Sequence, residues 1–110
     1  MNDEVRLEIN GIRFAWDKDK AAANWRKHGI TFEAAVWAFF DPNSVDVRDL
    51  AHEDDEPRRN IIAMTPGIVS TIFVVYVERI DIDDKEIIRI ISARKADKRE
   101  VRLYERSLSR

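Results

Sequence analysis

The chain has 110 residues, a formal net charge of -2 and no cysteine; 45% of its residues are hydrophobic and 36% are charged. This length fits one domain, residues 1–110, and the lack of cysteine excludes a disulfide framework, a thiolate metal site and a cysteine nucleophile. The apolar runs are too short to span a bilayer, and the acidic start is unlike a signal peptide. We therefore expect a cytoplasmic protein without membrane contacts.

A hairpin and a helix are predicted at the start of the chain. Apolar and polar residues alternate around Asn10-Gly11, a dipeptide that favours a two-residue hairpin turn. Asp17 is placed as the N-cap of a helix over 18–28, which Gly29 can end in a left-handed conformation. Its expected apolar face is formed by Ala21, Trp25 and His28.

A second helix is predicted immediately afterwards. Thr31 can cap it, and the helix should stop before Asp41-Pro42. Its apolar stripe consists of Phe32, Val36, Phe39 and Phe40. Tryptophans at such spacing are more often core residues than base-stacking platforms, which applies to Trp16, Trp25 and Trp37. The two helices should therefore supply most of the aromatic core.

The rest of the chain predicts several strands and a final helix. β-branched runs between turn residues indicate strands at 45–47, 60–64, 68–79 and from 87 onward, and a helix follows at 97–108. Short connections between successive strands favour an antiparallel meander. The expected fold is α+β, an antiparallel multi-stranded sheet with two N-terminal helices and a C-terminal helix packed on it.

The stretch from 87 to 100 carries the most information. Isoleucines on both faces indicate a strand inside the sheet, and Asp97 with Glu100 three residues later can form a capping box for the final helix. Arg89 and Arg94 interrupt the apolar pattern. A guanidinium is costly to bury alone, so each should reach the rim, a carboxylate or a bound anion. A strand that carries arginines into a basic helix suits a phosphate ligand.

The charges are distributed unevenly along the chain. From 89 to 110 there are eight basic and three acidic residues, whereas acidic residues dominate between 41 and 60. One end can attract a polyanion and the other a basic partner. Alternatively, both regions are solvent-exposed faces whose charges neutralise each other, because the counts of charged residues would then be the same.

No glycine-rich phosphate loop, Ser-His-Asp order or paired-histidine spacing is present. His52, next to Glu53, Asp54 and Asp55, invites a metal interpretation, but a flexible acidic loop explains it better, and we expect no cofactor. His28 can serve as a cap or core residue at a helix C-terminus or take part in chemistry. The remaining candidates are seven cations with one glutamate, an RNA-type site that needs no metal: Lys20, Lys27, His28, Arg59, Arg79, Arg89, Arg94 and Glu78.

Several motifs resemble the BrnT family of bacterial type II toxins, over nearly the whole chain from Ile12 to Tyr104. They are Trp16-Asp17 with Lys20 and Asn24, Lys27-His28-Gly29-Ile30 with Phe32-Glu33 and Ala35, Phe40-Asp41-Pro42, Glu78-Arg79, and Arg89 to Ala96 with Glu100 and Tyr104. The chain departs from the family pattern in its extra residues 2–11, its longer 80–85 loop and Met64 in place of a glycine.

The resemblance implies a RelE-like fold, an RNA substrate and an arrest of translation. It also implies neutralisation by a BrnA-type antitoxin with a ribbon-helix-helix domain, through which operator DNA is contacted only indirectly. The expected assembly is a homodimer or a toxin–antitoxin heterotetramer.

The expected chemistry is transesterification without a metal. A base deprotonates the ribose 2′-OH, arginines stabilise the charge that develops on the phosphate, and an acid protonates the leaving 5′-oxygen. The phosphate contacts fall to Arg59, Arg79, Arg89 and Arg94, and the proton-transfer group is drawn from Lys20, Lys27, His28 and Glu78. The competing hypothesis is a binding module without chemistry, which engages RNA or an antitoxin and acts in transcriptional autoregulation.

Overall fold

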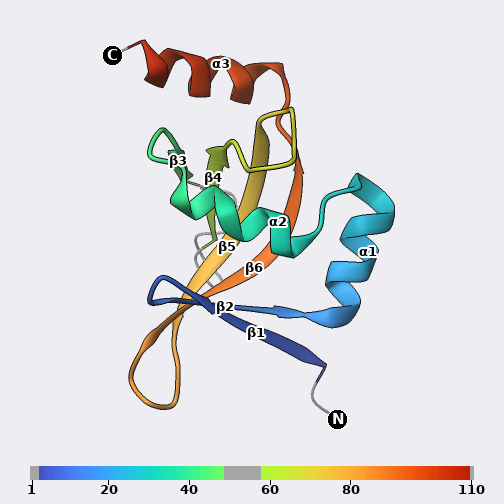
Figure 1. Cartoon of the computed structure of the whole chain (residues 1–110), viewed down its shortest axis with the longest axis vertical. Helices are drawn as coiled ribbons and strands as arrows, with labels where there is room; N and C mark the ends of the chain where they lie inside the picture. Colours follow the sequence, from blue (N-terminus) through green and yellow to red (C-terminus); the bar gives the residue numbers. More distant parts are fainter. Residues whose placement is uncertain (1–2, 49–57, 110) are drawn as a thin grey trace.

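The computed structural model describes residues 3–48 and 58–109, in which the strands form one six-stranded sheet of order β1-β2-β6-β5-β4-β3. Figure 1 shows this sheet with α1, α2 and α3 around it. The elements in chain order are β1 (Glu4–Ile9), β2 (Ile12–Asp17), α1 (Lys18–His28), α2 (Phe32–Val36), the 3-10 helix η1 (Trp37–Phe40), β3 (Val45–Arg48), β4 (Arg59–Ala63), β5 (Ile72–Ile80), β6 (Glu86–Lys95) and α3 (Lys98–Leu108).

The sheet is mixed, so the expectation of a purely antiparallel sheet was wrong. The β1–β2 hairpin turns at Asn10-Gly11 as predicted, but β2 then pairs with β6 in parallel, with Phe14 opposite Ile88. The other pairs are antiparallel. Turn residues report only on strands adjacent in sequence, whereas β2 and β6 are brought together through all the intervening elements. The α+β class is confirmed.

The helices are arranged differently from the expectation that all of them pack on the sheet. Helices α1 and α2 contact β6, but α3 lies across the end of the sheet, against β3 and β4 (Figure 1). Tyr104 of α3 donates its hydroxyl to Asp41 at 2.7 Å, and Ser107 reaches the carbonyl of Asn43. The short connection after β6 turns the chain away before α3 can fold back on a face.

The predicted helix ends are confirmed. The Asp17 carboxylate accepts from the Lys20 amide at 2.9 Å, and Gly29 ends α1 with a φ of 68°. Asp97 and Glu100 form the complete capping box at the start of α3. These signals were readable because a cap needs only residues within three or four positions.

The core was predicted incompletely. Trp16 is buried as expected, but Trp25 is 55% exposed and Trp37 is 40% exposed, so these two tryptophans are not core residues. The position that α1 buries is Asn24, whose side chain donates to the carbonyls of Ile30 and Ala93 and accepts from the Ala93 amide. A hydrophobic pattern cannot find a polar residue that is buried because it satisfies backbone groups.

Two element boundaries also differ from the prediction. The second helix is a short α-helix that continues as η1, and β5 begins at Ile72 rather than at residue 68. The position of β6 inside the sheet, between β2 and β5, is confirmed. Among the described residues, no helix is long and apolar enough to cross a membrane.

Candidate functional site

The alternation of side chains along the strands divides the candidate residues between two faces of the sheet. Tyr76 and Ile90 lie opposite each other in the core that α1 and α2 cover, and Arg59 lies opposite Tyr76 on the next strand. Because every second residue shares a face, Glu78 joins them, whereas Arg79 and Arg89 point to the other side. The eight predicted residues therefore do not form a single site.

On the helix side, Asp46, Arg59, Tyr76 and Glu78 form a group that we call the helix-side cluster. Arg59 Nη1 lies 3.1 Å from Glu78 Oε1, and Arg59 Nη2 forms an ion pair with Asp46. The side chains of Arg59 and Glu78 are each 49% exposed, so both partners are open to a ligand. The cluster thus places a carboxylate and a guanidinium side by side at an accessible surface.

Tyr76 is the buried member of the helix-side cluster. Its ring packs edge-on against Phe39, with the ring centroids 4.8 Å apart. Burial raises the pKa of Tyr76, and the Asp46 carboxylate raises it further, while the guanidinium of Arg59 acts in the opposite direction. The phenol is therefore protonated at neutral pH and available as a donor. The pKa of Arg59 is raised mainly by its hydrogen bond to Asp46.

On the opposite face, Glu4, Arg6, Arg79, Asp81 and Arg89 line a cavity of about 190 Å³, which we call the arginine pocket. Glu4 lies between two guanidinium groups, 2.6 Å from Arg89 and 2.7 Å from Arg6. Arg6 also reaches Asp81 at 2.7 Å. Five elements contribute to this pocket: β1, β2, β5, β6 and the turn that begins at Asp81.

The arginine pocket is strongly charged. The pKa of Glu4 is lowered first by the hydrogen bond from Arg6 and then by that from Arg89, and the pKa of Asp81 is lowered first by Arg6. Both carboxylates are therefore ionised at neutral pH. Three arginines and two carboxylates thus line the same small cavity.

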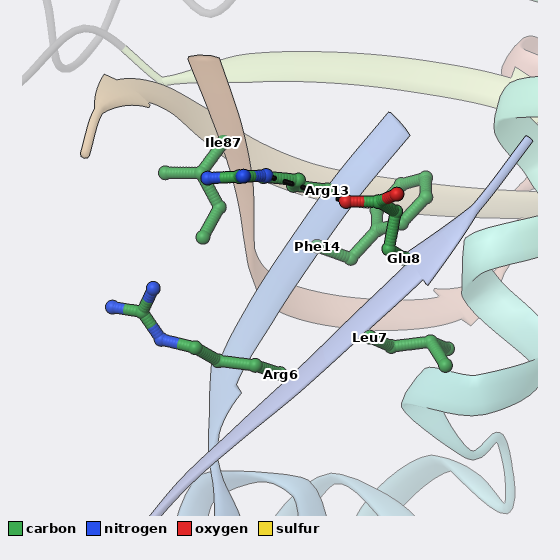
Figure 2. Close-up of a pocket in the computed structure, with 6 residues that line it drawn as sticks. All are labelled: Arg6, Leu7, Glu8, Arg13, Phe14 and Ile87. Carbon is green, nitrogen blue, oxygen red and sulfur yellow. Dashed lines mark hydrogen bonds and ion pairs between the residues drawn. The ribbon is translucent and has the colours of Figure 1, made fainter. Parts of the chain in front are cut away.

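An adjoining cavity of about 300 Å³ shares Arg6 and Ile87 with the arginine pocket. Figure 2 shows it between β1, β2 and β6, with Arg13 paired to Glu8. Arg13 also donates to Asp83 at 3.0 Å, and this hydrogen bond is the first cause of its raised pKa. The network of arginine–carboxylate pairs thus extends from β6 to the edge strand β1.

Arg94 lies at the far end of this face and has a different environment. Its guanidinium makes two hydrogen bonds of 2.8 Å to Glu100 and lies 4.2 Å from the ring centroid of Phe73. Glu100 also accepts from the Asp97 amide in the capping box. Arg94 therefore ties the start of α3 to the sheet.

The three candidates on α1 lie apart from the helix-side cluster. Lys20 and Lys27 are exposed and His28 is partly buried. Asn24 fixes α1 at Ala93, whereas Glu78 lies opposite Ile88, five positions and about 16 Å away along β6. These cations flank the helix-covered face.

The predicted loop with His52, Glu53, Asp54 and Asp55 lies outside the described residues. Within 3–48 and 58–109, no group of three or more histidine or carboxylate side chains converges as a metal site would require.

Sequence reasoning missed Asp46 and Tyr76 in the helix-side cluster and Glu4, Arg6 and Asp81 in the arginine pocket. Asp46 and Tyr76 could have been found from the strand register, because each shares a face with Arg59. Glu4 and Arg6 carried no such signal, since their strand reaches the pocket only through the parallel pairing of β2 with β6.

Comparison with protein families gives one match. Residues 16–100 match the model described as "Ribonuclease toxin, BrnT, of type II toxin-antitoxin system". The match contains β3 to β6, both N-terminal helices and the first turn of α3, and it leaves out β1 and most of β2. No match was found among curated proteins.

Proposed function

Because the chain belongs to the BrnT family of ribonuclease toxins of type II toxin–antitoxin systems, we propose that it is a metal-independent endoribonuclease that cleaves RNA and arrests translation. The observation that carries this proposal is the accessible pair of Arg59 and Glu78, 3.1 Å apart, with the phenol of Tyr76 behind it. These groups can supply the three functions that cleavage by the ribose 2′-OH requires: a base, a stabiliser of negative charge and a proton donor.

In the proposed reaction Glu78 accepts the proton of the ribose 2′-OH, and that oxygen attacks the adjacent phosphorus. Arg59 exchanges a carboxylate partner for the phosphate, because its planar fork can donate to two phosphate oxygens at once. Tyr76 donates a proton to the leaving 5′-oxygen, which its raised pKa permits at neutral pH. The bond from phosphorus to the 5′-oxygen breaks, and a 2′,3′-cyclic phosphate remains.

The other predicted residues have supporting roles in this proposal. Arg79 and Arg89 contact RNA phosphates on the opposite face, away from the scissile bond. Lys20, Lys27 and His28 contact the RNA from α1, and Arg94 holds α3. Because phosphate contacts are electrostatic and independent of sequence, these residues affect affinity more than the chemical step.

A type II toxin has an antitoxin partner, and we propose one of the BrnA type, with a ribbon-helix-helix domain that binds operator DNA, in a homodimer or a heterotetramer. The acidic stretch 41–56 was expected to attract such a basic protein, but 49–56 lies outside the described residues. Within the described part, Asp41 is bound to Tyr104 and Asp46 to Arg59. Antitoxin association should slow as salt rises, because exposed charges steer the encounter.

Incubation of end-labelled RNA with the purified protein in EDTA tests the proposal. Cleavage should survive chelation, leave 2′,3′-cyclic phosphate ends and disappear in Glu78→Gln, whose amide cannot accept the proton. Cleavage only after Mg²⁺ is added, or products that carry only 3′-OH ends, would mean that water rather than the ribose hydroxyl is the nucleophile.

One observation favours the alternative of a non-catalytic binding module. Arg59, Arg89 and Arg94 are each paired with a carboxylate of the protein itself. Such pairs can be purely structural. Labelled RNA distinguishes the two hypotheses, because a binding module would shift the RNA in a native gel without shortening it, whereas a nuclease would shorten it.

A further inference from the structure

Strand β1 lies outside the residues that match the family, yet it contributes two of the five charged groups of the arginine pocket, Glu4 and Arg6. We propose that the pocket is a binding site for an RNA phosphate and that Glu4 occupies it as an internal competitor. This proposal rests on RNA being the ligand of the protein, but not on where or whether the chain cleaves it.

The geometry of Glu4 resembles that of a bound oxyanion. Its two carboxylate oxygens take different arginines: Oε1 lies 2.6 Å from Arg89 Nη1, and Oε2 lies 2.7 Å from Arg6 Nε. A phosphate offers the same negatively charged acceptors with more oxygens. The cavity of about 190 Å³ is several times the roughly 30 Å³ that one liquid water occupies, so it has room for a phosphate group.

The charge balance explains why a phosphate can compete. Glu4 and Asp81 are the two carboxylates among the pocket's lining residues, so departure of Glu4 raises the formal charge of that lining by one unit. Asp81 is held in its turn by the Ile82 amide, which donates to it at 2.8 Å. Glu4 is thus the carboxylate that a phosphate would replace.

The position of Glu4 lowers the free energy that a phosphate needs to displace its side chain. It begins the edge strand β1, and its side chain is 21% exposed, as is that of Arg89. The Glu4 carboxylate can leave Arg89 by a change of side-chain rotamer, which keeps the backbone pairing of Glu4 with Asp17. A phosphate gains access to Arg89 by this movement of the side chain.

The test measures binding of a fluorescein-labelled 2′-O-methyl oligoribonucleotide by fluorescence anisotropy over a range of salt. This probe has no 2′-OH to attack its phosphate, so the measurement is independent of cleavage. Glu4→Gln should bind about three- to tenfold more tightly than the parent, the range expected for releasing a partly exposed ion pair. Its slope of log K against log salt should be steeper by about 0.7, which corresponds to one more neutralised phosphate.

Glu8→Gln is the matched control. Glu8 lies on the same strand and the same face as Glu4, and its side chain contacts Arg13 outside the arginine pocket. Glu8→Gln removes the same charge as Glu4→Gln. It should change affinity by less than twofold without changing the slope. Arg89→Ala in the Glu4→Gln background should abolish the gain.

Three results would overturn the proposal: equal gains in Glu4→Gln and Glu8→Gln, a folded Glu4→Gln with parental affinity, or a gain that survives the loss of Arg89. Glu4→Ala provides a second variant, and thermal melts accompany both. If both variants unfold, Glu4 is a structural anchor and not a competitor. If Glu4→Gln binds the probe more tightly but the parent protein cleaves no RNA, the proposed anion site stands and the proposed nuclease activity is wrong.

Discussion

The helix-side cluster and the arginine pocket use the same two kinds of side chain and suit different tasks. In the cluster, Arg59 and Glu78 are half exposed, and a buried phenol stands behind them. In the pocket, Arg89 and Glu4 are mostly covered, and further arginines surround them without a neutral proton donor. We therefore propose the first arrangement for proton transfer and the second for holding an anion.

The comparison shows that an arginine near a carboxylate does not by itself indicate a catalytic site. The helix-side cluster differs from the arginine pocket in the half-exposed Glu78, which substrate can reach, and in the adjacent phenol of Tyr76. Adjacent residues of one strand, Glu78 and Arg79, fall on opposite faces and so belong to different sites.

The largest expected effect is the loss of cleavage in Arg59→Ala. The rate should fall about 10²- to 10³-fold, as for removal of one donor to a charged transition state, while the melting temperature changes little. Initial rates on labelled RNA provide the measurement, and Arg102→Ala, an exposed arginine on α3, is the control. If Arg59→Ala cleaves RNA at the same rate as the parent, the helix-side cluster is not the catalytic site.

The second effect concerns stability. Arg94→Ala removes the two bonds to Glu100 and the contact with Phe73, and it should lower the free energy of unfolding by about 1–2 kcal/mol after allowance for solvent screening. Thermal melts measure this loss, with the exposed Lys95→Ala as control. If cleavage per folded molecule also fell a hundredfold, the face of the arginine pocket would take part in the chemistry.

Arg89→Ala in the Glu4→Gln background should weaken RNA binding about three- to tenfold relative to Glu4→Gln alone and reduce the salt slope by about 0.7, since the phosphate contact that Glu4 blocks in the parent is lost. In the parent, Arg89→Ala should change affinity by less than about twofold, and the fold should persist because Glu4 retains Arg6 as a partner at 2.7 Å. Anisotropy titrations with the 2′-O-methyl probe measure affinity and slope. Unaltered binding in the double variant would move the anion site out of the pocket.

The smallest expected effect concerns the pH dependence of the free energy of unfolding, which should differ between the arginine pocket and the helix-side cluster. The pKa of Glu4 is lowered, so its stabilisation is present above about pH 4.5 and is lost as pH falls through the lowered value. The pKa of Tyr76 is raised, so its contribution is present below about pH 10 and is lost as pH rises through the raised value. Denaturant titrations should show a flatter acid limb in Glu4→Gln and a flatter alkaline limb in Tyr76→Phe.

The alkaline limb needs a separate control, because Tyr104 also titrates there. Burial and the hydrogen bond to Asp41 raise the pKa of Tyr104 to about 12. Tyr104→Phe should therefore flatten the limb above about pH 10 independently of Tyr76. If Tyr104→Phe alone accounts for the whole limb, Tyr76 is not titrating as a buried phenol.

The sequence predicted the parts of the fold that depend on neighbours along the chain. The Asn10-Gly11 turn, the Asp17 and Thr31 caps and the Asp97-Glu100 capping box each involve residues within four positions, and all are present. The pairing of β2 with β6 depends on a contact across most of the chain, which a local pattern does not encode.

The candidate site was predicted in the same partial way. Arg59 and Glu78 were named from the sequence and lie together, but their neighbour Tyr76 was counted as strand interior. Glu4 was passed over as part of an acidic start, because its meaning depends on Arg89. Residue type identifies chemically able groups, and only the register shows which of them meet.

The parallel pairing of β2 with β6 also sets the order of events during synthesis. β2 precedes its partner β6 by about 70 residues, so at about 5–20 residues synthesised per second several seconds separate the two strands. The arginine pocket needs β1, β5 and β6 together. A nascent chain on the ribosome therefore lacks the pocket until β6 has emerged, and a product that stops before β6 cannot form this cluster of arginines.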